Sequence, residues 1–244
     1  MAVAEGIICK NPCDNVVLPV ESCIETKTKE QVTLNDSEIA EFKEAAIARY
    51  KTTNDYKSRD AIVLLIMLNL GLRVGEMLAL EWDDVNLNEN LIYINKTVQS
   101  NIKNFSSTGK SQYSRVKSST KTHSGIRVIP INNTVANYFE ELKMYDNKKG
   151  ITSRYVCATH AGTQNTSRNL QRSLDRLVNN TNIRKKVTLH TLRHTFGSTM
   201  LRRGVSIEVV SKLMGHSNIN ITYTKYIHVI QEQKAKAMQM VSIC

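Results

Sequence analysis

The stretch AIVLLIMLNL at residues 61–70 decides the fold class. Every residue in it except Asn69 is apolar, so the apolar side chains fall on all sides of a helix. A helix that is apolar all round lies buried in a protein core, and the unbroken run Ala61–Leu68 is far shorter than the roughly 20 residues that cross a bilayer. Gly71 ends the stretch, and Arg73 follows almost at once. We therefore expect the central helix of a multi-helix domain.

Further helices are predicted on both sides of this segment. Asn35, Asp36 or Ser37 can cap a helix that begins the domain. The three-four spacing of apolar residues and the caps Ser206 and Gly215 predict more helices. These lie at residues 74–80, 135–142, 170–178, 188–202 and 206–214.

Two β-prone runs, Leu91–Ile94 and Arg127–Ile131, are separated by a long polar connection. Together with the helices they predict a mainly α fold with a small antiparallel β-sheet. No acidic residue occurs between Glu89 and Glu140. One-sided charge on a hairpin fits a phosphate backbone. The expected DNA-binding residues are Lys96, Lys103, Lys110, Arg115, Lys117 and Arg127.

The composition agrees with a nucleic-acid partner. Among 244 residues, 33 Lys and Arg against 22 Asp and Glu give a formal net charge of +11, which favours a polyanion. The 41% hydrophobic content excludes a collagen or a disordered tail. Five cysteines without a C-x-x-C pair suggest reduced thiols rather than a disulfide framework or a zinc ribbon. The N-terminus lacks a signal sequence, so we expect a soluble, cytoplasmic protein.

Arginine and histidine side chains stand in or beside the apolar helices where a core would need other residues. His190 and Arg193 are three residues apart and share a helix face. Arg73 follows the apolar stretch that Gly71 ends, and His216 follows the helix cap Gly215. Guanidinium and imidazole groups together suit a phosphate. Each also has a plain alternative: Arg73 pairs with Glu76, His190 is a hydrogen-bonded core histidine, and His216 merely follows a helix cap.

Five short motifs follow one another along the chain: LGLRVGE at 70–76, KTHSGIRVIP at 121–130, HTLRHTF at 190–196, LMGHSN at 213–218 and YIHV at 226–229. In this order and at these separations they resemble the tyrosine recombinase, or phage integrase, family. The resemblance implies the fold of a recombinase catalytic domain. It also implies a site-specific DNA recombinase that uses a covalent 3′-phosphotyrosyl intermediate to integrate or excise a mobile element.

The resemblance assigns a role to each matching residue. Arg73 and Arg193 would clamp the scissile phosphate, because planar guanidiniums stabilise the extra charge of the transition state. Tyr226 would be the nucleophile, with Tyr223 as a rival by proximity. Lys121 would protonate the leaving 5′ oxygen.

The resemblance also assigns roles to two histidines and one glutamate, and it offers two lysines for one role. Lys117 competes with Lys121 for the role of the catalytic lysine. His190 would assist proton transfer at the nucleophile, and His216 would hydrogen-bond the phosphate. Glu76 would order the site. No metal and no cofactor is expected, since the cations take the place of a metal.

Two other function classes compete with this interpretation. A metal-dependent hydrolase could use His190, His194 and His216, although Arg193 would place a cation beside the metal. A DNA-binding module without catalysis could use the basic hairpin and one helix face. That face carries Arg168, Arg172 and Arg176, and it could equally be a solvated surface.

The expected domain division has three parts. Residues 1–32 are a linker and the remnant of a preceding core-binding domain, and residues 33–230 are the catalytic domain. Residues 231–244 form a tail, including Ala235 and Met238, that either docks on a neighbouring protomer or packs on its own domain. The expected partners are double-stranded DNA, other protomers of the same recombinase and accessory DNA-bending proteins, with no membrane.

Overall fold

A computed structural model describes residues 31–104, 112–119 and 125–240, together with residues 3, 6–12 and 14. The chain divides into two compact units, Met1–Glu30 and Gln31–Cys244. All helices and strands named below belong to the second unit. Within the described ranges, no helix combines the length and the apolar character that spanning a lipid bilayer requires.

Helix α2 (Arg59–Leu70) is the central helix that the apolar stretch predicts. Its residues are buried from Ala61 to Leu68, and it contacts α1 (Asp36–Ala46), α4 (Asn133–Lys149), α5 (Ser167–Val178) and α6 (Leu189–Arg202). Gly71 ends α2 with a φ of +60°. A Cβ at Gly71 would lie 2.3 Å from Cδ1 of Phe196, so only glycine fits the close approach of α6.

The predicted caps fix the ends of the surrounding helices. Asn35 accepts from the Glu38 N–H at 2.9 Å, and the Glu38 carboxylate accepts from the Asn35 N–H at 2.8 Å, which closes a capping box at the start of α1. Ser206 and Gly215 cap α7 (Ile207–Met214) as expected. Short α3 (Val74–Ala79) follows Arg73 directly. The mainly helical fold class is therefore confirmed.

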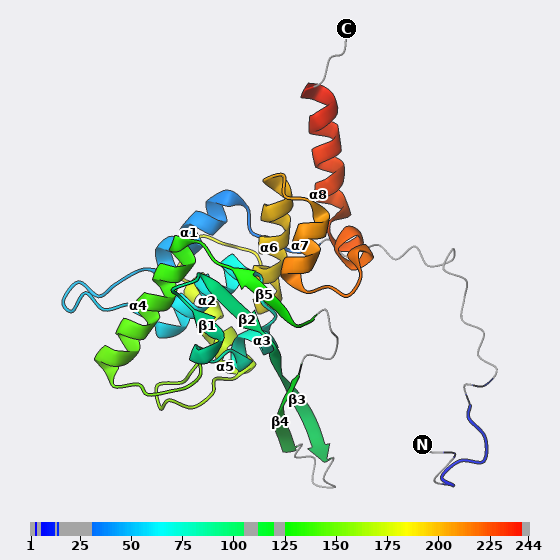
Figure 1. Cartoon of the computed structure of the whole chain (residues 1–244), viewed down its shortest axis with the longest axis horizontal. Helices are drawn as coiled ribbons and strands as arrows, with labels where there is room; N and C mark the ends of the chain where they lie inside the picture. The colour runs from blue at the N-terminus through cyan, green and yellow to red at the C-terminus, as the bar shows by residue number, and fades with distance from the viewer. Residues whose placement is uncertain are drawn as a thin grey trace. The chain divides into compact units, whose positions relative to one another are not determined.

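A small antiparallel sheet packs beside the helices (Figure 1). Its order is β1 (Val85–Asn86), β2 (Leu91–Ile94) and β5 (Arg127–Pro130), and β1 follows a 3-10 turn at Trp82–Asp84. In the β2–β5 pair, Ile92 lies opposite Ile129, and both are buried. The sheet is the antiparallel pair that the two β-prone runs predict, with one short strand added.

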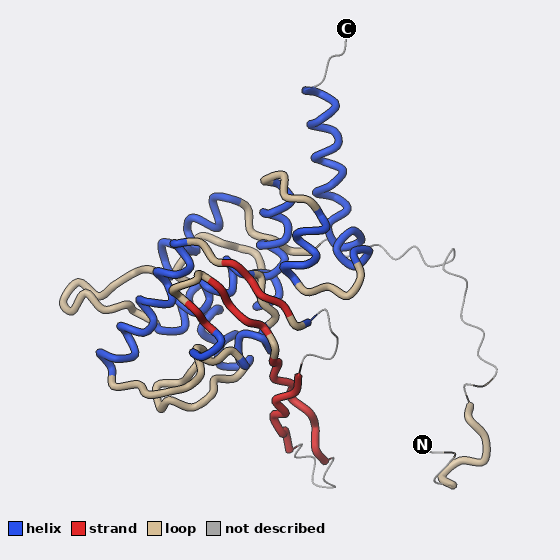
Figure 2. Tube along the Cα trace, viewed as in Figure 1, coloured by secondary structure: helices blue, strands red, loops and turns tan. Residues whose placement is uncertain are grey.

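The polar connection between β2 and β5 contains a second sheet. Strand β3 (Lys96–Asn104) pairs with β4 (Gln112–Ser119) in an antiparallel hairpin, and Figure 2 shows this ribbon extending away from the helices. The root of β3 packs against α3. A Cβ at Gly75 would lie 2.7 Å from the carbonyl oxygen of Val98, so the absence of a side chain at Gly75 lets the hairpin reach the helix.

A second, smaller apolar cluster joins α6, α7 and α8 (Ile219–Met240). Its buried members are Leu201, Val210, Met214, Tyr226 and Val229. Helix α8 is interrupted at Tyr226, where φ is −118° and ψ is 18°.

Beyond this cluster α8 continues into the segment expected to be a separate tail. Gln233 Nε2 donates to the carbonyl oxygen of Leu201, so the start of the tail packs on its own domain. Met238, farther along, is 77% exposed. Residues 241–244 lie outside the described residues.

Candidate active site

Helix α6 brings four residues to one face, at the three-four spacing that places side chains next to one another on a helix. Thr188 caps the helix, and His190, Arg193, His194 and Gly197 follow. Arg193 is buried, and its two terminal nitrogens donate to the carbonyl oxygens of Gly71 at 2.7 Å and Met214 at 2.6 Å. These bonds tie the α2 and α7 ends to α6, so Arg193 is fixed in position.

Arg73 brings a second guanidinium to the same place from the start of α3. Its Nη1 atom lies 2.8 Å from Glu76 Oε1, and its Nη2 atom donates to the Gly215 carbonyl at 2.8 Å. The plain ion pair with Glu76 is therefore present. The Arg73 side chain nevertheless stays 38% exposed, so a ligand can still reach it.

Glu76 is buried between two arginines. Arg127 binds both of its carboxylate oxygens, at 3.0 and 2.9 Å, and the Arg73 backbone N–H donates to it at 2.8 Å. Burial by itself would raise the pKa of Glu76, but the hydrogen bonds and charges of Arg127 and Arg73 outweigh burial and lower it to about 2. Glu76 is thus ionised at every physiological pH. We call Arg73, Glu76, Arg127 and Arg193 the guanidinium cluster.

Two histidines lie at the edge of this cluster. His216 follows Gly215, and its Nδ1 atom lies 2.7 Å from Thr222 Oγ1. Burial, followed by the charge of Arg193, lowers the pKa of His216 to about 3. The pKa of His190 is lowered too, by partial shielding from water and then by the charge of Arg193. His216 is therefore a neutral imidazole at pH 7 that can share a hydrogen bond without adding charge.

Tyr226 lies in the small apolar cluster beside α6, and its side chain is buried. Its hydroxyl donates to the Met214 sulfur at 3.7 Å and lies 3.4 Å from His194 Nδ1. Burial raises the pKa of Tyr226 to about 12, against a smaller lowering effect of Arg193. The rival Tyr223 is 42% exposed. In the part of the chain that the structure describes, Tyr226 therefore reaches the face of α6, whereas Tyr223 faces solvent.

The predicted basic residues of the connection fall into those outside the described residues, those on the hairpin strands, and two that form ion pairs. Lys110 and Lys121 lie outside the described residues. Lys103 belongs to β3, and Arg115 and Lys117 belong to β4. Lys117 pairs in register with Val98.

The other two basic residues differ from the expectation of phosphate binding. Lys96 pairs with Glu81 at 2.6 Å and Asp84 at 2.8 Å, and Arg127 belongs to the guanidinium cluster. The basic run alone does not predict these ion pairs, because the acidic partners of both residues come before the run in the sequence.

Sequence reasoning missed two residues near the cluster. The sequence offers His194 only as a metal ligand, but in the structure it contacts Tyr226. Lys225 is half-buried, and burial followed by the charges of Arg193 and Arg73 lowers its pKa. The one available signal was position, since Lys225 precedes Tyr226 and His194 follows Arg193.

The histidines do not converge as the metal-hydrolase alternative requires. His194 Nδ1 faces Tyr226, and His216 Nδ1 faces Thr222. Over the described ranges, no three His, Cys, Asp or Glu side chains gather in an arrangement that could hold a metal ion.

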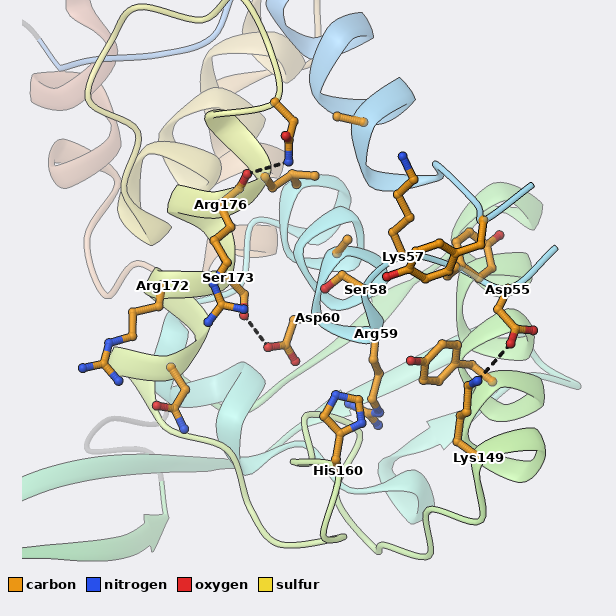
Figure 3. A pocket seen from close by; sticks show the side chains of 18 of the residues that line it. Asp55, Lys57, Ser58, Arg59, Asp60, Lys149, His160, Arg172, Ser173 and Arg176 are labelled. Atoms are coloured by element: carbon orange, nitrogen blue, oxygen red, sulfur yellow. Dashed lines mark hydrogen bonds and ion pairs between the residues drawn. The ribbon is translucent and has the colours of Figure 1, made fainter. Parts of the chain in front are cut away.

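A cavity of about 830 Å³ lies apart from the guanidinium cluster. Its lining includes Arg172, Ser173 and Arg176 of α5 together with Asp60 and His160, all labelled in Figure 3. Ser173 Oγ donates to Asp60 Oδ2 at 2.6 Å. No member of the guanidinium cluster lines this cavity, so it is separate from the candidate site.

The fold is also found in solved recombinases. Over 98% of this chain and 74% of the other, it matches a Tn1549 transposon integrase in complex with a circular intermediate DNA, with a TM-score of 0.70 and 23% identity. XerA recombinase matches over 90% of this chain and 68% of the other, with a TM-score of 0.63 and 19% identity. These likenesses confirm the fold of a recombinase catalytic domain.

Sequence comparison identifies the family. The chain is 27% identical to a XerC-like tyrosine recombinase of Caldanaerobacter subterraneus subsp. tengcongensis over 98% of this chain and 61% of the relative. It is 32% identical to the integrase of Staphylococcus phage L54a over 69% of this chain and 48% of the relative. The chain thus spans about half to three fifths of the length of these relatives. The phage integrase family model matches residues 36–233, and the chain therefore belongs to the phage integrase family.

Proposed function

We propose that the protein is a site-specific DNA recombinase that cleaves and rejoins DNA strands through a covalent 3′-phosphotyrosyl intermediate. The observation that carries this proposal is the convergence of Arg73 and Arg193. They come from different helices, yet they donate to the adjacent carbonyls of Gly215 and Met214. His216 follows those carbonyls directly. Two fixed guanidiniums beside an imidazole suit the charge of a phosphoryl transition state.

The two arginines retain donors for a phosphate. A guanidinium carries five N–H groups, and the described bonds of Arg193 use its two terminal nitrogens once each. Burial and the charge of Arg73 lower the pKa of Arg193 to about 9, which leaves it charged at pH 7. His216 would add a neutral hydrogen bond to the same phosphate, and His190 would take up the proton that the nucleophile loses.

The proposed cleavage step needs neither water nor a metal. The Tyr226 oxygen attacks the phosphorus and forms a phosphotyrosyl ester, while the bond to the 5′ oxygen breaks. Lys121 gives that oxygen a proton, and His190 takes the phenol proton. In the reverse step a 5′ hydroxyl attacks the ester and releases Tyr226. The phosphotyrosyl ester thus retains the energy of the broken phosphodiester for rejoining. The Tyr226 hydroxyl must leave Met214 and His194 before it can attack.

DNA contacts are proposed for two basic surfaces. Strands β3 and β4 supply Lys103, Arg115 and Lys117, and Lys110 lies between these strands in the sequence. The exposed side of α5 supplies Arg168, Arg172 and Arg176. Because each phosphate contact releases counterions, binding should weaken steeply with added salt.

The proposed domain division places the catalytic domain at residues 33–230. Leu34 is buried, and its N–H donates to Thr195 Oγ1 at 3.0 Å, which supports a boundary near residue 33. Residues 1–32 would be a linker and the end of a core-binding domain. Within residues 231–244, the part after Gln233 would dock on a neighbouring protomer. Accessory DNA-bending proteins and a cytoplasmic location fit the same activity.

A suicide substrate tests the proposal. In a DNA duplex nicked next to the cleavage position, the short fragment that carries the new 5′ hydroxyl diffuses away and the covalent intermediate accumulates. We expect a protein–DNA adduct that survives denaturing electrophoresis and carries the DNA on Tyr226 by mass spectrometry. DNA binding without an adduct would instead support the DNA-binding module.

A further inference from the structure

The end of α7 gathers three arginines. Its last carbonyls have no partner within the helix and carry the negative end of the helix dipole. Three consecutive carbonyls accept one arginine each: Leu213 from Arg127 at 2.7 Å, Met214 from Arg193 at 2.6 Å and Gly215 from Arg73 at 2.8 Å. Two of these arginines, Arg73 and Arg193, are the proposed phosphate clamp, and the third is Arg127.

The N–H donors of Arg127 bind acceptors of the protein itself. Its Nε atom binds Leu213, and its terminal nitrogens bind both oxygens of Glu76 and, at 3.3 Å, the carbonyl of Gly125. Its side chain is 8% exposed, whereas that of Arg73 is 38% exposed. Arg127 therefore has little left to offer a DNA phosphate.

Glu76 is the shared partner of Arg127 and Arg73. With Arg127 in place, the carboxylate divides its charge between two cations. Without it, Arg73 becomes the remaining guanidinium on Glu76, and a full ion pair would draw Arg73 away from a ligand. Arg127 thereby controls how much of the Arg73 charge is available.

We propose that Arg127 is a positioning residue of the phosphate clamp. It acts through Glu76 on Arg73 and through Leu213 on the α7 end that precedes His216, and it does not contact DNA. This inference rests on the proposed recombinase function. A lysine at this position keeps the charge, but one ammonium cannot span two carboxylate oxygens and a carbonyl in the fixed fork of a guanidinium.

Arg127→Lys tests the assignment in the full chain. Half-site affinity and the single-turnover rate of adduct formation are measured on the nicked substrate. The rate is also measured on a matched substrate whose scissile phosphate is a methylphosphonate, which lacks the negatively charged oxygen. Arg49→Lys is the control, because Arg49 pairs with Glu141 at 3.4 Å outside the site.

The expected result separates positioning from binding and from general folding. Arg127→Lys should keep its half-site affinity within about twofold and lose on the order of tenfold or more in rate on the phosphodiester. The loss should shrink on the methylphosphonate, because a neutral centre depends less on the clamp. Arg49→Lys should cleave both substrates as the wild type does.

Several outcomes would overturn the inference. These are a normal rate on the phosphodiester, an affinity loss as large as the rate loss, and an equal rate loss on both substrates. If Arg127→Lys does not fold, Arg127→Gln, which leaves Glu76 in place, is used in the same assays. A wild-type protein that forms no adduct overturns the proposed function and this assignment with it.

Discussion

His194 Nδ1 lies 3.4 Å from the hydroxyl oxygen of Tyr226. The proposed nucleophile thus contacts the residue that follows Arg193. Burial raises the pKa of Tyr226 to about 12 and lowers that of His194 to about 4. In this pocket the phenol keeps its proton and the imidazole is neutral, so the pocket holds the nucleophile in an unreactive state.

Tyr226→Phe should abolish the covalent adduct and leave DNA affinity nearly unchanged. The substitution removes one nucleophilic oxygen and no charge. Tyr223→Phe is the matched control, because Tyr223 is the exposed tyrosine one turn earlier in α8. Adduct formation on the nicked substrate and a gel shift measure the two properties. An adduct lost in Tyr223→Phe alone would show that Tyr223 is the nucleophile.

Gly197→Ala should expel the Tyr226 ring from its pocket. A Cβ at Gly197 would lie 2.4 Å from the Tyr226 hydroxyl oxygen and 3.0 Å from the Met214 sulfur. Overpacking costs about 1–3 kcal/mol, and the gain in helix propensity of about 1 kcal/mol offsets only the low end of that range. We expect a lower Tm and faster nitration of Tyr226 by tetranitromethane.

Ser198→Ala is the control for this effect on the same helix. Among the described residues the buried Ser198 hydroxyl has no hydrogen-bond partner, so its removal should cost no stability. If Gly197→Ala and Ser198→Ala gave the same Tm and the same nitration rate, the close packing of Tyr226 on α6 would be disproved.

Arg73→Lys should retain DNA binding but slow cleavage on the order of a hundredfold. Lysine keeps the charge and loses the planar fork that stabilises the transition state. The single-turnover rate and the half-site Kd are measured together. Near-normal cleavage would return Arg73 to the plain role of an ion-pair partner for Glu76.

Chelation with EDTA should leave strand cleavage unchanged. In the proposed mechanism, Arg73, Arg193 and Lys121 supply the positive charge that a divalent cation would otherwise provide. Adduct formation is compared with and without EDTA after extensive dialysis. A loss of cleavage that a divalent metal restores would support the metal-dependent hydrolase instead.

Stability should fall as the pH drops from 7 to 5. Burial, the first cause in both cases, lowers the pKa of His194 to about 4 and that of His216 to about 3, from an ordinary 6.5. Below pH 6.5 the unfolded chain binds protons that the folded chain does not, so the folded state loses stability. The Tm at pH 7 and pH 5 measures this. The double variant His194→Gln, His216→Gln should show a smaller difference, and an unchanged difference would contradict the assignment.

The sequence predicts the fold well because its signals are local. The apolar run of α2, the capping box at Asn35 and the glycine after α2 each act within a few residues. The site was predicted through the order of five motifs, not through contacts. Arg127 was therefore assigned to DNA, since its partner Glu76 lies 51 positions away in the chain, and no periodic pattern connects them.

The environment of Tyr226 is a second feature that sequence reasoning could not supply. It depends on the break in α8 at Tyr226 itself and on the absence of a side chain at Gly197. Both are tertiary effects. Helical spacing alone would have placed Tyr223 and Tyr226 on one continuous helix with similar surroundings.

The packing of Gly75 against Val98 connects α3 directly to the β3–β4 hairpin. This helix begins next to Arg73, contains Glu76 and supports the root of the β3–β4 hairpin. A displacement of β3 would therefore be passed on to Arg73 and Glu76 through α3. In the proposed recombinase, DNA binding by the hairpin and the position of Arg73 would then be coupled. A duplex that binds the hairpin weakly would also be cleaved slowly.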